Sequence, residues 1–335
     1  MRLKELDVLR GLAALSVVMF HFTAKYREEF GHSFDKMYDW DYGHYGVQLF
    51  FIISGFVIFL TILNVKTLKE FAYKRFTRLY PTYWVCLILT FVVVRSFGLE
   101  GREISTRDAV IGLTMFQGLF KLPSVDGAYW SLLPELLFYI FMGILFSLRL
   151  LSKIRVVGMI WLVLMIINIF YKIPYFYLLL NLKYGMFFLA GMLFYRIKFH
   201  IGDKYDHVLV FCCFITALLT ELTWGNAIST TLIFSLFYLF VYDKLTFLSN
   251  KVFLFLGWVS YPLYLLHQNI GFIIIRELQK HLQVNFLVVI GVAGIMVFCA
   301  WLVTAYIEKP IMAVLRKRKE KKKDLLVVNV TSTGL

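Results

Sequence analysis

The stretch RGLAALSVVMFH, residues 10–21, has the composition of a membrane-spanning segment that begins with an arginine and ends with a histidine. Eleven steps of an α-helix at about 100° each make roughly three turns, so Arg10 and His21 share one helical face about 16 Å apart along the axis. Ionisable groups are costly inside a bilayer and mark functional sites by default. This pair is therefore the first candidate for chemistry.

The rest of the composition is that of an integral membrane protein. Of the 335 residues, 60% are hydrophobic and 17% are charged, and the mean hydropathy is +0.74. The net charge of +14 is spread between apolar runs, which argues against a nucleic-acid partner. The four cysteines lie in apolar segments without a CxxC pair, so neither a disulfide framework nor a zinc site is indicated.

Apolar runs that approach the roughly 20 residues needed to cross a bilayer predict an all-α membrane bundle of about ten transmembrane helices. An even number of spans puts both termini on one side, and most of the 35 lysine and arginine residues lie at the N-terminus, in alternate loops and in the tail. Positively charged loops are cytoplasmic, so we predict a multi-pass protein of the inner (cytoplasmic) membrane with both termini inside. The expected spans lie near residues 6–23, 46–64, 81–97, 129–148, 155–171, 175–195, 207–222, 227–242, 253–275 and 285–306.

The chain divides into an integral membrane domain over residues 1–310 and a basic cytoplasmic tail over residues 311–335. The composition of the tail predicts disorder and contact with anionic lipid head groups. Two long loops, residues 24–45 and 98–128, face outward in this topology. In the second loop, Ser105 and Asp108 have capping-box spacing, which predicts a short interfacial or re-entrant helix.

Polar residues recur in the outer half of the predicted bundle. Glu135 shares a helical face with Ser131 and Tyr139 at four-residue spacing. A carboxylate at this depth needs a partner, and Lys183 is one candidate. Packed, hydrogen-bonded helix contacts stay open as an alternative role for each histidine. Four residues in different spans reach a similar depth and suit a polar pocket that opens outward: His21, Glu135, Lys183 and His267.

The cytoplasmic side carries a second group of ionisable residues. Arg75 and Arg78 share one helical face just before the third predicted span, and Arg10 lies at the same membrane surface. Guanidinium groups bind phosphates through paired hydrogen bonds, so these three residues are candidates for an anion site. The alternative is that they only set the topology.

Other motifs exclude several kinds of chemistry. The HxxxxD pattern of soluble and peripheral glycerolipid acyltransferases, GxSxG and the P-loop are absent. One further cluster has side chains of the types that bind metals, but no recognisable hydrogen-bonding residues that would orient them as ligands. We therefore interpret it as a solvated loop and assign no metal site. It comprises His200, Asp203, Asp206 and His207.

Five pieces of the chain, in order, resemble the acyltransferase-3 family of integral membrane acyltransferases, most of which modify cell-surface carbohydrates. They are LDVLRGLAALSVVMFH, LFFIISGFVI, FTRLYPTYW, YWSLLPELLFY and SYPLYLLH. Arg10, ten intervening residues and His21 match the signature spacing of that family. The resemblance implies that His21 is catalytic and that Glu135 belongs to the working pocket. It also implies that Arg10, Arg75 and Arg78 bind an acyl-CoA donor.

The resemblance implies transfer of an acyl group from cytosolic acyl-CoA to a carbohydrate hydroxyl, in a reaction that needs no metal. By analogy with relatives, we expect the donor to be acetyl-CoA. The acceptor would be a polysaccharide, a lipopolysaccharide or a lipid-linked glycan. His21 would act as general base, and Glu135 or another polar group would share in catalysis by orienting its ring and stabilising the imidazolium. A covalent acyl-histidine stays open. Four residues would line the substrate pocket: Ser131, Tyr139, Lys183 and His267.

The rival hypothesis is a secondary transporter or exporter in which the same intramembrane charges relay protons. The two hypotheses differ in the donor. An acyltransferase needs acyl-CoA and releases CoA, whereas a transporter needs neither.

Overall fold

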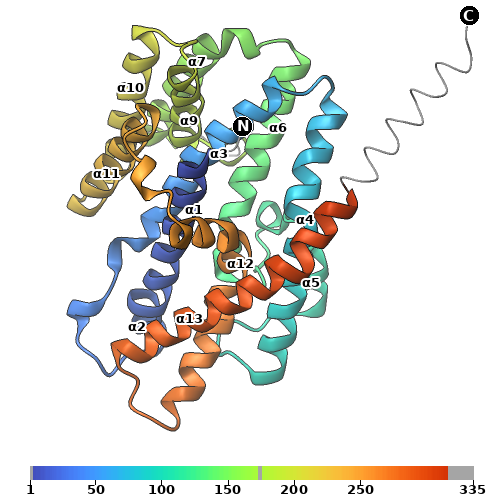
Figure 1. The fold of residues 1–335 in the computed structure, drawn as a ribbon, viewed down its shortest axis with the longest axis vertical. Helices are drawn as coiled ribbons and strands as arrows, with labels where there is room; N and C mark the ends of the chain where they lie inside the picture. Colours follow the sequence, from blue (N-terminus) through green and yellow to red (C-terminus); the bar gives the residue numbers. More distant parts are fainter. Residues whose placement is uncertain (1–2, 173–175, 316–335) are drawn as a thin grey trace, which may run out of the picture.

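The computed structural model describes residues 3–172 and 176–315, and over these residues the chain is built from helices and loops without a strand (Figure 1). Each of the ten predicted spans overlaps one long helix. These helices are α1 (Lys4–Phe20), α3 (Gly46–Leu63), α4 (Leu68–Phe97), α6 (Leu132–Ser147), α7 (Ile154–Phe170), α9 (Gly185–Lys198), α10 (Lys204–Thr220), α11 (Trp224–Val241), α12 (Lys251–Gln279) and α13 (Phe286–Val303).

The all-α membrane bundle is confirmed, but the number of crossings is not. Seven helical stretches in the described part of the chain are long and apolar enough to cross a membrane. Helices α9, α10 and α12 are not among them. Helix α12 has the length of a span, but serine, histidine, glutamine and asparagine interrupt its apolar residues. The seven candidate spans make the chain a multi-pass membrane protein.

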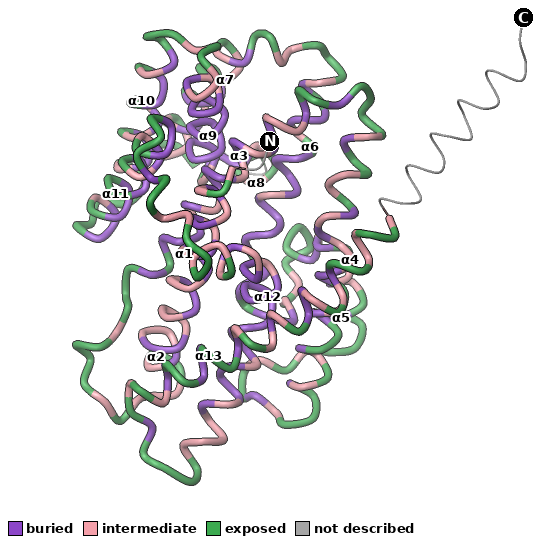
Figure 2. The backbone as a smooth tube through the Cα atoms, in the orientation of Figure 1, coloured by how far each residue is buried: buried purple, intermediate pink, exposed green. Residues whose placement is uncertain are grey.

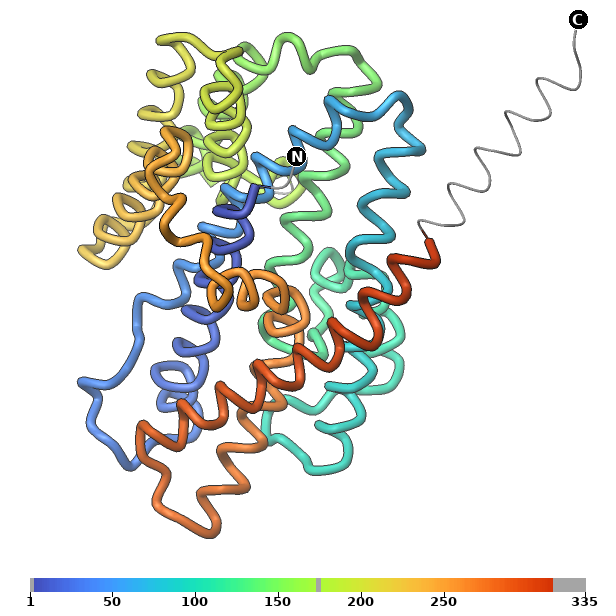
Figure 3. Tube along the Cα trace, in the orientation of Figure 1, coloured from blue at the N-terminus to red at the C-terminus, as the bar shows by residue number. Residues whose placement is uncertain are grey.

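The two ends of the described chain lie toward the same end of the molecule. Figure 3 shows the start of α1 and the end of α13 in the upper half of the view, and the loops near residues 31–45 and 98–104 in the lower half. The helical stretch that contains α13 continues to Leu315, and the predicted tail beyond that residue lies outside the described residues.

Helices α1 and α12 make the most extensive helix–helix contact in the bundle, and they run in the same direction. Glycines allow this contact: a Cβ atom on Gly11 would lie 2.5 Å from the backbone nitrogen of Gly257, and one on Gly257 would lie 2.0 Å from a carbonyl oxygen of α1. Small residues permit such close backbone approach between membrane helices. His21 and His267 each lie ten residues after their glycine, so the crossing brings them together.

Helices α3 and α9 pack in the same manner. A Cβ atom on Gly191 would lie 2.1 Å from the carbonyl oxygen of Ile52, and one on Gly55 would lie 2.1 Å from that of Phe188. Figure 2 shows that α9 is buried along almost its whole length. The neighbouring α10 and α11 are exposed along one side. Helix α9 is therefore a central helix, although it is too short to count as a span.

Helix α4 is longer than the predicted span. It begins after its N-cap Thr67 and continues through Pro81 to Phe97, so Arg75 and Arg78 lie within the helix and not in a loop before it. The charged first half lowers the local hydropathy, which is why the predicted span begins only at residue 81. The expectation that the two arginines share one helical face is confirmed.

The outer loop contains the predicted short helix, α5 (Thr106–Gly112), with Ser105 as its N-cap. The end of this loop is fixed to α12 through Asp126, which is fully buried. Its carboxylate accepts hydrogen bonds of 2.9 Å from the backbone N–H groups of Ala128 and Asn269. Burial raises the pKa of Asp126 to about 6.

The prediction that the loop with His200, Asp203, Asp206 and His207 is solvated is wrong for one residue. Asp206 is fully buried, and its carboxylate accepts hydrogen bonds from Arg155 at 2.7 Å and from Arg196 at 2.8 Å. Asp203 caps the N-terminus of α10 and forms a capping box with Asp206. Two guanidinium groups balance the buried charge, so these carboxylates join α7, α9 and α10.

Candidate active site

His21 and His267 form a directly bonded pair at the contact between α1 and α12. Nε2 of His267 lies 3.0 Å from Nδ1 of His21. His21 begins a π-helical turn, His21–Lys25, which interrupts the α-helix, and such turns often occur at functional sites. His267 is fully buried, whereas His21 is partly exposed.

The carbonyl groups around the pair fix its tautomers when both rings are neutral. Nδ1 of His267 lies 2.8 Å from the carbonyl oxygen of Tyr264, which only accepts, so Nδ1 carries the proton and Nε2 is an acceptor. Nδ1 of His21 lies between this acceptor and the carbonyl oxygen of Val17 at 2.9 Å, so it must donate. Nε2 of His21 is then unprotonated, and no described residue hydrogen-bonds to it.

Side chains from the segment before α6 hydrogen-bond to the backbone of α12 on either side of His267. The hydroxyl of Tyr129 donates to the carbonyl oxygen of Leu265 at 3.0 Å, while Asp126 accepts from the N–H of Asn269. In a regular α-helix this carbonyl and this N–H would be partners. The turn that carries His267 is therefore shaped by groups outside its own helix.

The imidazole of His21 faces a pocket of about 460 Å³, which we call the histidine pocket. Gln48 also lines it, and its buried Oε1 atom has no hydrogen-bond partner in the described structure. The remaining lining residues are Val17, Phe20, His44, Val47, Trp130, Tyr184 and Tyr264. A polar ligand in this pocket would therefore meet a free imidazole nitrogen and an unpaired amide oxygen.

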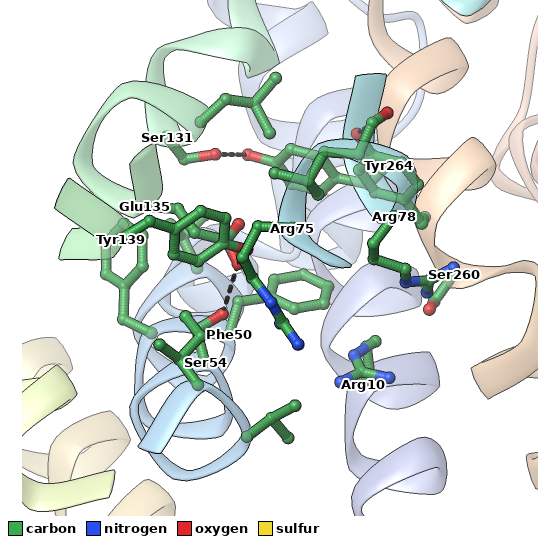
Figure 4. A pocket seen from close by; sticks show the side chains of 17 residues that line it. Arg10, Phe50, Ser54, Arg75, Arg78, Ser131, Glu135, Tyr139, Ser260 and Tyr264 are labelled. Carbon is green, nitrogen blue, oxygen red and sulfur yellow. Dashed lines mark hydrogen bonds between the residues drawn. The ribbon is translucent and has the colours of Figure 1, made fainter. Parts of the chain in front are cut away.

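A second pocket, of about 790 Å³, lies toward the termini, and we call it the arginine pocket. Figure 4 shows the guanidinium groups of Arg10, Arg75 and Arg78 gathered in one part of it. It shares Val47 and Tyr264 with the histidine pocket, so the two adjoin.

The three arginines differ in their partners. Arg78 forms an ion pair with Glu308, and Arg10 lies 3.4 Å from Asp7. Arg75 has no carboxylate partner in the described part of the chain: it donates to the hydroxyl of Thr61 at 2.7 Å, and its buried Nε is unpaired. Arg75 is therefore the cation of this pocket best prepared to bind an added anion.

Glu135 lies in the arginine pocket and does not contact His21. One carboxylate oxygen accepts hydrogen bonds from Ser54 at 2.8 Å and from Tyr139 at 2.7 Å (Figure 4). Ser131 lines the same pocket, and its hydroxyl lies 2.7 Å from that of Tyr264. Ser131, Glu135 and Tyr139, which were predicted to share one helical face, thus all line this pocket.

Lys183 lies in a third pocket, of about 1000 Å³, which we call the outer pocket. This pocket shares Trp130 and Tyr184 with the histidine pocket. The four residues predicted to share one polar pocket are therefore separated: Glu135, His21 and Lys183 line three adjoining pockets, and the buried His267 lines none of the three. The order is the arginine pocket, the histidine pocket and then the outer pocket.

Three residues of the site are not among those predicted from the sequence: Gln48, Ser54 and Tyr264. Ser54 lies in the quoted piece LFFIISGFVI and Tyr264 in SYPLYLLH, so a signal for both was present. Their partners, Glu135 and Ser131, are 81 and 133 residues away along the chain, and only the fold identifies them.

A comparison with known families covers most of the chain. The family model described as an acyltransferase domain, of the acyltransferase-3 type, matches residues 3–305. No curated protein and no solved structure gives a match. The matched range includes all three pockets.

Proposed function

Because the chain belongs to the acyltransferase-3 family of membrane acyltransferases, we propose that it transfers an acyl group from acyl-CoA to a carbohydrate hydroxyl. The donor is acetyl-CoA or another acyl-CoA. The acceptor is a polysaccharide, a lipopolysaccharide or a lipid-linked glycan presented outside the inner membrane. Both termini are cytoplasmic in this proposal, which puts the arginine pocket on the side where acyl-CoA is made.

The observation that carries the proposal is the unprotonated Nε2 of His21 between the arginine pocket and the outer pocket. A general base must present such a lone pair to the hydroxyl that it activates. Since the histidine pocket adjoins the arginine pocket at Val47 and Tyr264, a pantetheine arm can reach His21 while its phosphates stay among the arginines. Arg75, Arg78 and Arg10 bind these phosphates.

The reaction then proceeds as a direct transfer. The acceptor hydroxyl gives its proton to Nε2 of His21 as its oxygen bonds to the thioester carbonyl carbon. The C–S bond breaks, and the CoA thiolate takes the proton back from the imidazolium. During this step Nδ1 of His21 still donates to His267 and to the carbonyl of Val17, and both acceptors stabilise the positive ring.

Glu135 serves the donor side of this site. Two hydroxyl groups, from Ser54 and Tyr139, hold its carboxylate within the arginine pocket. The carboxylate balances part of the guanidinium charge when the donor is absent. We therefore assign Glu135 to donor binding and not to orientation of the imidazole of His21.

The test is a purified preparation in lipid nanodiscs with acetyl-CoA and glycans extracted from the cells that carry the gene. We expect thiol release and a glycan mass increase of one acetyl group in equal amounts. Absence of both with acetyl-CoA and with longer acyl-CoA donors would reject the proposal. Solute or proton movement in liposomes without thiol release would favour the transporter instead.

A further inference from the structure

We propose that the outer pocket is the acceptor site and that the acceptor glycan carries an anionic oxygen group, a carboxylate or a phosphate, which Lys183 binds. This inference rests on the proposed function, because it names the chemical class of the acceptor for the same site. It depends on three observations: the position of the pocket, its aromatic wall and its charge.

The position of the outer pocket suits an acceptor. It joins the histidine pocket at Trp130 and Tyr184, whereas the arginine pocket joins the histidine pocket at other residues, Val47 and Tyr264. Its walls come from residues 117–124, 129–134 and 177–184. In the proposed topology the first belongs to an outward-facing loop, and the third to the outer part of the span predicted over residues 175–195. A sugar seated there has a direct route for one hydroxyl to Nε2 of His21.

The wall shared by the two pockets is aromatic. The rings of Trp130 and Tyr184 lie 5.4 Å apart, and Trp130 is 44% exposed. Exposed aromatic faces of this kind pack against the C–H face of a sugar ring, while the indole N–H and phenol O–H supply hydrogen bonds at the edges. The shape and chemistry of this wall therefore match a glycan.

The charge of the pocket has one sign. Lys183 is the single charged side chain among the described residues that line it, and its ammonium lies 5.2 Å from the ring centre of Tyr184, without a carboxylate partner in the described structure. The amide N–H groups of Gln117 and Asn181 donate to Ser124 and to the carbonyl of Pro134. The buried Oε1 of Gln117 has no hydrogen-bond partner in the described structure, so it can accept a bond from a ligand hydroxyl. The charged group that a ligand meets among the described lining residues is the ammonium of Lys183.

The sequence around the pocket reinforces this sign. The chain has no aspartate or glutamate between Asp108 and Asp126, or between Glu135 and Asp203, and these two intervals supply nine of the thirteen lining residues. The positive-inside rule places lysines on the cytoplasmic side of the membrane, so it does not explain a lysine on the outer side. A negatively charged ligand accounts for the position of Lys183.

Binding of three matched probes tests the inference without requiring catalysis. The probes are methyl glucoside, methyl glucuronide and methyl glucoside 6-phosphate, titrated by NMR against the protein in nanodiscs. We expect at least one anionic probe to bind about fivefold more tightly than the neutral probe, the upper range for a solvent-accessible ion pair. The stronger of the two identifies carboxylate or phosphate as the source of the charge.

Two variants of Lys183 and one control complete the experiment. Lys183→Gln should bring the three dissociation constants together, and Lys183→Glu should make the neutral probe the best ligand. Lys36→Gln removes the same charge from the other outer loop and should leave the preference unchanged. Equal affinity for all three probes, no binding of any probe, or a preference that survives Lys183→Gln would overturn the inference. Thiol release from acyl-CoA is measured on the same samples, so a failure of the proposed function is recorded separately.

Discussion

Replacement of His267 by leucine removes the acceptor that fixes the tautomer of His21, and it should lower kcat for acyl transfer about tenfold. The bond from Nδ1 of His21 to Nε2 of His267 is 3.0 Å long. Hydrogen bonds between neutral groups contribute about 0.5–1.5 kcal/mol, and bonds to charged groups about 1.5–3 kcal/mol. The difference of about 1–2 kcal/mol is gained only when His21 becomes positive, which corresponds to a factor of about 10 in rate.

The second acceptor limits the loss. The carbonyl of Val17, 2.9 Å from Nδ1 of His21, remains in His267→Leu and still favours the same tautomer. The assay is steady-state thiol release at saturating acceptor, with KM for acyl-CoA measured in parallel. We expect KM for the donor to stay constant, because the donor phosphates bind in the adjoining pocket.

Glutamine at position 267 separates a positioning role from a packing role. Its amide oxygen can accept from His21, so His267→Gln should recover part of the lost kcat while having a size similar to histidine. Transfer by His267→Leu at the wild-type kcat would refute the reasoning. A loss of thermal stability in both variants with an unchanged kcat per folded molecule would return His267 to a structural role.

Three other outcomes are expected. Arg75→Gln should raise KM for acyl-CoA by about tenfold or more, since a charge-assisted bond is worth about 1.5–3 kcal/mol, whereas Arg95→Gln on the same helix should not change KM. Asp126→Asn should remove a pH dependence of stability. Because the pKa of Asp126 is raised in the folded state, the free energy of unfolding of the wild type should fall by about 1 kcal/mol as pH rises from 5 to 7.5, and that of the variant should not. Thermal melts across this range measure the difference, and a wild-type melting temperature as independent of pH as that of the variant would contradict the prediction. A single cysteine at Asp35 should react with an impermeant reagent added to intact cells and one at Lys153 should not; the reverse pattern would invert the proposed topology.

The helices were predictable because apolar runs of bilayer length carry a strong sequence signal. Every predicted span overlaps a long helix, and Ser105 marks the short outer helix correctly. The start of α4 was not predictable in the same way, because the charged turns before Pro81 lack the hydropathy of a span.

The candidate site was predictable in its members but not in its connections. Arg10, Arg75, Arg78 and Glu135 do line one pocket. The pairing of His21 with His267 spans 246 residues of sequence and depends on the glycine crossing of α1 and α12, which no local pattern reveals. The partners of Glu135 are likewise hydroxyl groups, where the sequence had suggested Lys183. Residues far apart in the chain have no spacing from which a contact can be inferred.

The most direct measurement is acyl transfer by His21→Gln at fixed acyl-CoA and acceptor, with CoA binding measured on the same preparation. Glutamine retains a hydrogen-bonding side chain of similar volume but cannot take a proton from a hydroxyl. The account predicts unchanged CoA affinity and a fall in transfer of about 10²–10⁴-fold, the usual contribution of a positioned general base. A folded His21→Gln protein that binds CoA and transfers acyl groups at the wild-type rate would contradict it.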